Sequence, residues 1–270
     1  MSHRTDLVYQ YDGSFDGFLC CVFRAIYQKE DPLAIFPEDS AQATLLETVL
    51  IDTEPDKAQR VRKSIPAKIG ADALRVVQWC FLSALEDKEV ALLAFLRLGY
   101  RVGSHVLRML TDPCVHKVLT AARNVANEAH LLKGFTRFSE HGGALTAEIE
   151  PKNDVLPILA RHFRARMPQE SFLIYDRTHK QALVSSGGWC QILPMEQAEL
   201  PKAGVQEQFY RRLWTRFYDT VSIEARYNPK CRMTHMPKRY WGMMTEFQEE
   251  NRPSALPENG SSHSEKFKKK

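Results

Sequence analysis

Cysteine is scarce in this sequence, and the few cysteines are not spaced as metal ligands. There are six in 270 residues; Cys20 and Cys21 are adjacent, and the other four stand alone. Zinc and iron–sulfur sites need closely spaced pairs of thiolates, and a chain of this length can build a core without disulfides. The sequence therefore predicts reduced thiols, no metal site and no bound cofactor.

Long apolar runs are also missing. The longest, Val90–Leu96, is about a third of the roughly 20 residues that a membrane-spanning helix needs. The first residues do not form the basic and then apolar pattern of a secretory leader. We therefore expect a soluble protein of the cytoplasm that has no membrane partner.

Positive charge is concentrated in one part of the chain. Residues 1–150 carry 17 Lys and Arg against 20 Asp and Glu, a balance of −3, and residues 151–270 carry 20 against 13, a balance of +7, which sum to +4. A localised excess of Lys and Arg is typical of proteins that bind a polyanion. The asymmetry favours nucleic acid as a partner.

Hydrophobic periodicity predicts an α+β fold with a helical N-terminal half and a small, mostly antiparallel sheet with flanking helices. Asp112 is expected to cap a helix over residues 113–133, which Gly134 ends. We expect a single domain over residues 1–250, helical over about 14–133 and β-containing over about 134–250, and a disordered basic tail over 251–270. The predicted strands are residues 7–11, 135–139, 145–149, 172–175, 182–184 and 189–193, and further helices are predicted over 15–27, 154–167 and 206–224.

A turn after the first predicted strand contains two carboxylates. Asp12 and Asp16 flank Gly13 and Ser14 at a strand-to-helix junction. Such a pair is typical of general acid–base catalysis, and N–H groups at a helix N-terminus can bind phosphate. The alternative is structural, because Asp-Gly is a common turn and Ser or Asp a common helix cap.

The predicted helix 113–133 carries a polar stripe beside its apolar one. Arg123 and His130 lie on this stripe, and it continues through Lys133 toward Arg137 in the following strand. Arg and Lys can hold phosphates, and a histidine can transfer a proton near neutral pH. The alternative is an ordinary solvated helix face.

A segment near the C-terminus is both basic and aromatic. Residues 225–244 contain no Asp or Glu. Cations interleaved with aromatic rings suit a nucleic-acid backbone and an unstacked base. The alternative is that the aromatic rings pack on the core while the cations are solvated. The candidate contacts are Lys230, Lys238, Arg239, Tyr240 and Trp241.

Several motifs in this order resemble a bacterial family catalogued as the domain-of-unknown-function 4130 family and described as a probable DNA metabolism protein. The resemblance spans about residues 8–248. The motifs are Tyr11–Phe18, Arg97–Tyr100, Glu128–Phe138, Ile149–Pro151 with Asn153–Pro157, and Asn228–Lys230 with Met236–Trp241.

The resemblance implies a companion of a radical SAM protein in DNA modification or repair. Longer relatives carry a uracil-DNA glycosylase-like domain, but this chain has a polar tail there instead, so that activity is not carried over. The family has no assigned catalytic residues, so none are inherited.

Three functions are compatible with these patterns. The first is a DNA-binding protein of DNA modification or repair that acts with a radical SAM partner; Arg137, Lys238 and Arg239 then hold phosphates, and Tyr240 or Trp241 stacks a base. The second is a stand-alone hydrolase or nucleobase-processing enzyme around Asp12, Asp16 and His130. The third is a protein-binding adaptor for the radical SAM enzyme.

Overall fold

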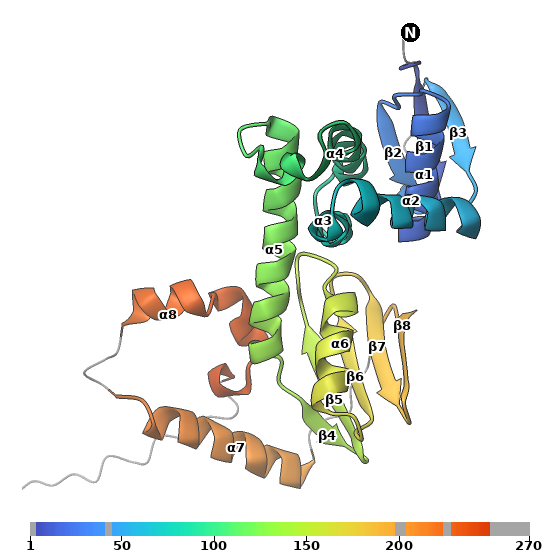
Figure 1. The fold of residues 1–270 in the computed structure, drawn as a ribbon. Helices are drawn as coiled ribbons and strands as arrows, with labels where there is room; N and C mark the ends of the chain where they lie inside the picture. Colours follow the sequence, from blue (N-terminus) through green and yellow to red (C-terminus); the bar gives the residue numbers. More distant parts are fainter. Residues whose placement is uncertain (1–3, 41–44, 198–203, 224–227, 249–270) are drawn as a thin grey trace, which may run out of the picture. The chain divides into compact units, whose positions relative to one another are not determined.

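The computed structural model describes residues 4–40, 45–197, 204–223 and 228–248 (Figure 1). Its internal contacts divide the chain into two compact units. Unit 1 comprises Met1–Gly134 and Pro151–Arg166, and unit 2 comprises Phe135–Glu150 and Met167–Lys270. Helices dominate unit 1 and unit 2 contains the larger sheet, so the chain has the mixed α+β architecture that the sequence predicts.

Unit 1 begins with a three-stranded parallel sheet, of which only the first strand was predicted. Strands β1 (Leu7–Tyr11), β2 (Ala34–Pro37) and β3 (Glu47–Ile51) run parallel in the order β2-β1-β3. Helix α1 (Phe15–Tyr27) joins β1 to β2 and packs on the sheet (Figure 1). The short strands β2 and β3 have no clear alternation, and pairing with the buried strand β1 stabilises them more than their local sequence does.

The remaining helices of the N-terminal region form the core of unit 1. A short 3₁₀ helix, η1 (Glu38–Ser40), follows β2, and helices α2 (Pro55–Lys68), α3 (Ala71–Phe81) and α4 (Lys88–Val102) follow β3. Seven of the fifteen residues of α4 are buried, and its buried apolar side chains lie in the same hydrophobic core as α1.

One segment of this core is apolar enough to cross a membrane by length and composition. It comprises Lys88–Arg108, which includes α4 and the 3₁₀ helix η2 (Gly103–Arg108), and 39% of its most apolar window is buried. A core helix passes the same test. The burial of Leu92, Phe95 and Leu96 at 0% exposure is consistent with a soluble protein.

Helix α5 (Pro113–Phe135) begins as predicted and ends later than predicted. The Asp112 carboxylate accepts hydrogen bonds from the backbone N–H groups of Cys114 (2.9 Å) and Val115 (3.1 Å), which confirms the cap. The helix continues past Gly134, so the prediction that this glycine ends it is wrong. A glycine inside a helix costs only about 1 kcal/mol relative to alanine, which does not by itself end the helix. Helix α6 (Leu156–Arg166) completes unit 1.

Unit 2 contains a five-stranded sheet in the order β4-β5-β6-β7-β8. Only the β5–β6 pair is parallel, so the sheet is mostly antiparallel, as predicted. The predicted disordered tail, residues 251–270, lies outside the described residues, and the prediction of a single domain over 1–250 stays a prediction. The strands are β4 (Ser139–His141), β5 (Ala144–Ile149), β6 (Phe172–Asp176), β7 (Gln181–Ser186) and β8 (Trp189–Pro194), and the helices are α7 (Val205–Thr220), α8 (Pro229–His235), η4 (Lys238–Met243) and η5 (Thr245–Phe247).

Candidate nucleic-acid interface

The acidic turn at the carboxyl end of β1 is held by its own hydrogen bonds. Asp12 Oδ1 accepts hydrogen bonds from the backbone N–H (2.9 Å) and the hydroxyl (2.7 Å) of Ser14, and Asp12 Oδ2 accepts one from the Thr53 hydroxyl (2.8 Å). A Cβ added to Gly17 would lie 2.2 Å from Asp12 Oδ1. The carboxylate therefore lies directly against the first turn of α1.

Asp12 lies where open parallel α/β sheets generally bind an anion. In an open parallel sheet, ligands bind where the strand order reverses, here between the carboxyl ends of β1 and β3, and a helix N-terminus there favours an anion. Burial alone would raise the pKa of Asp12, but the hydrogen bonds from Ser14 and Thr53 lower it below its ordinary value. A carboxylate held in its charged form is a poor proton donor at neutral pH.

The three predicted catalytic residues are not in contact with one another. Asp16 forms an ion pair with Arg62 of α2. His130 lies on the exposed side of α5, and among the described residues no hydrogen bond or ion pair joins it to Asp12 or Asp16. The acidic turn therefore has the structural role of a turn and helix cap, and a catalytic role for these residues stays a prediction.

The polar stripe of α5 is solvated, as an exposed helix face would be. Arg123 and His130 are exposed, and Lys133 is half-buried. Partial burial, together with the nearby positive charges of Lys133 and Arg166, lowers the pKa of His162. The carboxyl end of α5 is therefore a basic region of unit 1.

In the basic segment near the C-terminus, the described rings pack against neighbouring side chains and the predicted cations are exposed. Tyr240 is only 3% exposed and packs against Phe135 at 5.6 Å between ring centroids, which gives its ring a packing role. That Tyr240 or Trp241 stacks a base stays a prediction. Trp241 already stacks on Phe247 at 4.5 Å, and the Arg232 guanidinium lies 4.9 Å from its ring centroid. The rings are used in packing, while the predicted cations Lys230, Lys238 and Arg239 remain exposed.

Arg137 has a buried partner in unit 2. Its guanidinium donates two hydrogen bonds to the Glu246 carboxylate, at 3.1 Å and 2.7 Å, and lies 5.5 Å from the Trp214 ring centroid. Trp214 Nε1 donates a third hydrogen bond to Glu246 (3.1 Å). A phosphate would have to compete with this carboxylate, so the structure favours a packing role for Arg137.

This buried carboxylate predicts a loss of stability in acid. Burial alone would raise the pKa of Glu246, but the hydrogen bonds and charge of Arg137 lower it below the ordinary value of 4.5. The stabilisation is thus complete above about pH 4.5 and is lost as the pH falls through the lower pKa of the folded state. Urea unfolding should show Glu246→Gln to be about 2 kcal/mol less stable than wild type at pH 7, because a charged acceptor is removed. The difference in the free energy of unfolding between the two proteins should shrink toward pH 3. A difference that does not change with pH would contradict this prediction.

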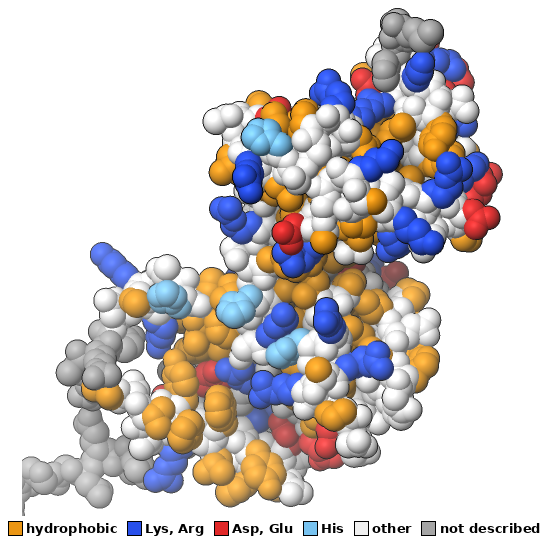
Figure 2. Space-filling model, in the orientation of Figure 1, with side chains coloured by type: hydrophobic (Ala, Val, Ile, Leu, Met, Phe, Trp, Pro, Cys, Tyr) orange, Lys and Arg blue, Asp and Glu red, His pale blue; other side chains and the backbone are white. Residues whose placement is uncertain are grey.

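A groove that the sequence analysis did not identify lies within unit 1, between α1, α2 and α4. We call it the α1–α2–α4 groove; its volume is about 870 Å³. Lys and Arg side chains gather over these helices on the face shown in Figure 2. Of the described residues that line the groove, none is acidic. The charged and aromatic lining residues are Phe23, Tyr27, Arg60, Lys63, Lys68, Arg97, Tyr100 and Arg101.

An exposed aromatic stack forms one wall of this groove. The rings of Phe23 and Tyr27, one turn apart on α1, stack at 4.2 Å, and Tyr27 is 58% exposed. Arg60 of α2 lies over both rings, and its guanidinium donates a hydrogen bond to the Tyr27 hydroxyl (2.8 Å). The wall therefore presents a rigid ring surface beside a cation.

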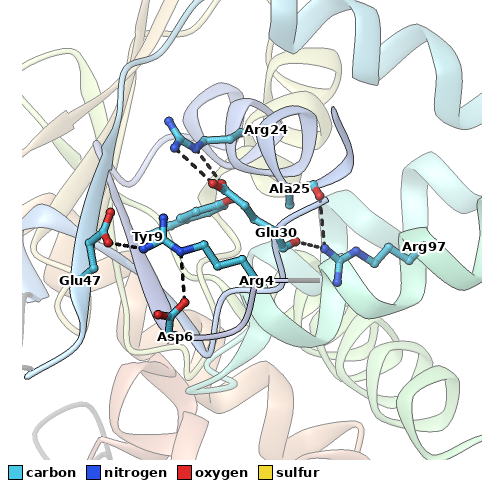
Figure 3. Close-up of polar contacts among 8 residues, drawn as sticks. All are labelled: Arg4, Asp6, Tyr9, Arg24, Ala25, Glu30, Glu47 and Arg97. Carbon is cyan, nitrogen blue, oxygen red and sulfur yellow. Dashed lines mark hydrogen bonds and ion pairs between the residues drawn. The ribbon is translucent and has the colours of Figure 1, made fainter. Parts of the chain in front are cut away.

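A second wall is fixed by the guanidinium of Arg97 on α4. Figure 3 shows this group directed at two backbone carbonyls, those of Ala25 (3.4 Å) and Glu30. Arg97 also pairs with Asp31. The Glu30 carboxylate in turn accepts hydrogen bonds from Tyr9 (2.6 Å) and Arg24 (2.9 Å). Arg97 therefore positions α4 against the end of α1 and is not available to a ligand.

The other cations of the groove are not neutralised. Lys63, Lys68 and Arg101 are exposed, and none of them forms an ion pair with a residue that the structure describes. The ammonium group of Lys68 lies 5.7 Å from the Tyr100 ring centroid. Three uncompensated cations beside exposed aromatic rings are suited to bind an anionic ligand that has a planar group.

One signal in the sequence could have identified this groove. Residues 55–68 contain five cations within a single helix, and the motif Arg97–Tyr100 continues into Arg101. Composition alone does not reveal these cations, because the net charge of residues 1–150 is negative. Only the packing of α1, α2 and α4 shows that the cations converge while the acidic residues lie elsewhere.

The chain matches the model of a known protein family. The family described as domain of unknown function DUF4130 matches residues 86–246, which is more than half of the chain. The protein therefore belongs to the DUF4130 family. Neither the curated proteins nor the solved structures gave a significant match. The match begins just before α4 and includes all the described residues of unit 2 up to Glu246, so α1 and α2 lie outside it.

Proposed function

We propose that this protein binds DNA through the α1–α2–α4 groove and acts in DNA modification or repair in the cytoplasm. The observation that supports the proposal is the set of three uncompensated cations, Lys63, Lys68 and Arg101, beside the exposed Phe23–Tyr27 stack. Lysine side chains bind phosphates as point charges, and aromatic rings stack on unpaired bases at about 1 to 3 kcal/mol per base.

The groove favours an unpaired strand over an intact duplex. A base can reach the Tyr27 ring only when it is not stacked in a helix, and this holds for a single strand, a gap or an extruded nucleotide. A volume of about 870 Å³ lies within the roughly 300 to 1,000 Å³ of ligand pockets. We therefore expect a damaged or partly single-stranded site to be the preferred substrate.

The proposal includes a radical SAM protein as the partner. It rests on the resemblance to the probable DNA metabolism family. In this view the radical chemistry belongs to the partner, and this chain supplies DNA contact. Co-purification of the two proteins at low salt without DNA would support a direct interaction.

Binding to labelled oligonucleotides tests the DNA proposal. Fluorescence anisotropy should be measured for a single strand, a duplex and the same duplex that contains uracil, at 50 and 200 mM salt. Three phosphate contacts predict a slope of log K against log salt of about −2, so that single-strand affinity falls about 16-fold between these concentrations. The intact duplex should bind more weakly. Absence of binding, or binding that does not respond to salt, would contradict the proposal.

A further inference from the structure

Helix α7 of unit 2 exposes its apolar side to solvent. Phe209, Leu213 and Phe217 are 56%, 52% and 55% exposed. Figure 2 shows hydrophobic side chains gathered along this helix. A helix in a globular protein normally turns its apolar stripe toward the core, and a contiguous exposed patch of this kind marks an interaction site.

The opposite side of α7 is polar and holds the helix in this orientation. Arg211 donates hydrogen bonds to the Glu207 carboxylate (2.9 Å) and to the Ser139 hydroxyl of β4 (2.5 Å). Glu207 also accepts the backbone N–H of Glu140 (3.3 Å). Thr215, on the same side, is completely buried. Rotation of the helix to bury its aromatic rings would break these contacts.

An apolar groove of about 800 Å³ lies beside the exposed side of α7, within unit 2. Its two cations, Arg137 and Arg211, are each paired with a carboxylate, Glu246 and Glu207. The floor of this groove is therefore close to neutral. Its aromatic and aliphatic lining residues are Phe138, Tyr210, Leu213, Trp214 and Phe217.

This neutral floor distinguishes the α7 surface from the α1–α2–α4 groove. A nucleic-acid strand requires uncompensated cations along its phosphates, and the two cations that line this groove, Arg137 and Arg211, are already paired with carboxylates. The surface also includes exposed aliphatic side chains beside its aromatic rings, namely Val205 (84%), Leu213 and Val221 (55%). Aliphatic and aromatic side chains beside a groove are instead typical of sites that bind an amphipathic helix.

Charge on one border of the surface indicates the chemistry of that helix. At 100° per residue, Arg212 and Arg216 lie one turn apart along the edge of the Phe209–Leu213 face that is opposite to the groove. Both are exposed, and Arg216 has no ion pair among the described residues. A partner that has carboxylates along one edge of its apolar side complements this border.

We propose that α7 and its neighbouring groove dock an amphipathic helix of another protein, whose apolar anchors are bordered by Asp or Glu. The anchors enter the groove between Leu213 and Phe217, and the carboxylates meet Arg212 and Arg216. This interaction is separate from DNA binding, because it uses unit 2 and a neutral, apolar surface. A protein that binds DNA in unit 1 can thereby be recruited by a second protein through unit 2.

Synthetic helical peptides test this proposal. The probes are 16-residue peptides with leucine at positions i, i+4 and i+7, bordered in one peptide by glutamate and in a matched peptide by lysine. Fluorescence anisotropy should show at least tenfold tighter binding of the glutamate peptide. Leu213→Asp/Phe217→Asp should weaken that binding at least tenfold, and circular dichroism should be unchanged because both side chains are more than half exposed.

A charge-reversal variant distinguishes specific docking from nonspecific hydrophobic binding of the peptide. Arg212→Glu/Arg216→Glu should reverse the preference, so that the lysine peptide binds more tightly. Failure of the glutamate peptide to bind overturns the proposal. It is also overturned if Leu213→Asp/Phe217→Asp dissociates a dimer seen by light scattering, which would assign the surface to a second copy, or lowers oligonucleotide affinity, which would assign it to DNA.

Discussion

Reversal of two charges in the α1–α2–α4 groove should weaken single-strand DNA binding at least about 50-fold at 50 mM salt. Lys63 and Lys68 supply two of the three groove cations, with Arg101, that form neither an ion pair nor a side-chain hydrogen bond with a described residue. At this salt concentration, release of counterions from a single strand contributes a factor of about 8 per phosphate contact, and two lost contacts multiply to roughly 60. The measurement is anisotropy of Lys63→Glu/Lys68→Glu across a salt series, in which the slope should become less negative by about 1.4.

A matched variant in unit 2 provides the control. Arg177→Glu/Lys180→Glu changes the net charge by the same amount on the exposed β6–β7 turn. It should alter affinity only a few-fold, through long-range electrostatics that salt screens. Equal losses in the two variants would show that net charge, not the groove, determines binding.

The basic segment near the C-terminus makes a competing prediction. If it holds the DNA backbone, Lys238→Glu/Arg239→Glu should lower affinity and slope as strongly as the groove variant does. The structure favours the groove because Tyr240 is buried and Trp241 is only partly exposed, whereas Tyr27 of the groove is 58% exposed. A large loss in this variant and none in Lys63→Glu/Lys68→Glu would overturn the assignment to unit 1.

The sequence predicted those parts of the fold that are determined by local interactions. Asp112 caps α5 because its carboxylate reaches the first free N–H groups, and the apolar stripe of that helix from Val115 to Leu132 is buried as its spacing predicts. The strands β2 and β3 were not predictable in the same way. Their hydrogen-bond partner is β1, which β2 reaches through the α1 crossover and β3 reaches on the other side of β1, so neither pairing is local in the sequence.

The candidate site was harder to predict, because it depends on which side chains are buried and on which helices pack together. Tyr240 and Trp241 share a basic segment in the sequence, and only packing shows that the first ring belongs to the core. Lys63 and Arg101 are 38 positions apart, and they line one groove because α2 and α4 pack together. Spacing along a chain indicates which side chains share a helix face, but not which helices meet.

Removal of the buried Glu128 carboxylate should lower the free energy of unfolding more than Glu246→Gln does. Glu128 of α5 is 2% exposed and accepts hydrogen bonds from the backbone N–H groups of Lys152 (3.0 Å) and Asn153 (2.9 Å) and from the Asn153 side chain (2.5 Å). Asn153 Oδ1 also accepts the N–H of Ala84 (3.1 Å). Glu128→Ala leaves these donors without an acceptor, and we expect a loss of about 3 kcal/mol in the free energy of unfolding, measured by urea titration.

Two further variants decide whether this network is the cause. Asn127→Ala, on the exposed side of the same helix, should change stability by less than about 0.5 kcal/mol. Glu128→Gln keeps one acceptor oxygen and should lose less than Glu128→Ala. A loss below about 1 kcal/mol in Glu128→Ala would show that solvent replaces the carboxylate.

Glu128 and Asn153 lie in two of the motifs on which the family resemblance rests, and their contacts hold Pro151–Arg166 against the rest of unit 1. The hydrogen bonds of this network therefore account for Glu128 and Asn153 structurally: these residues hold the returning segment against unit 1.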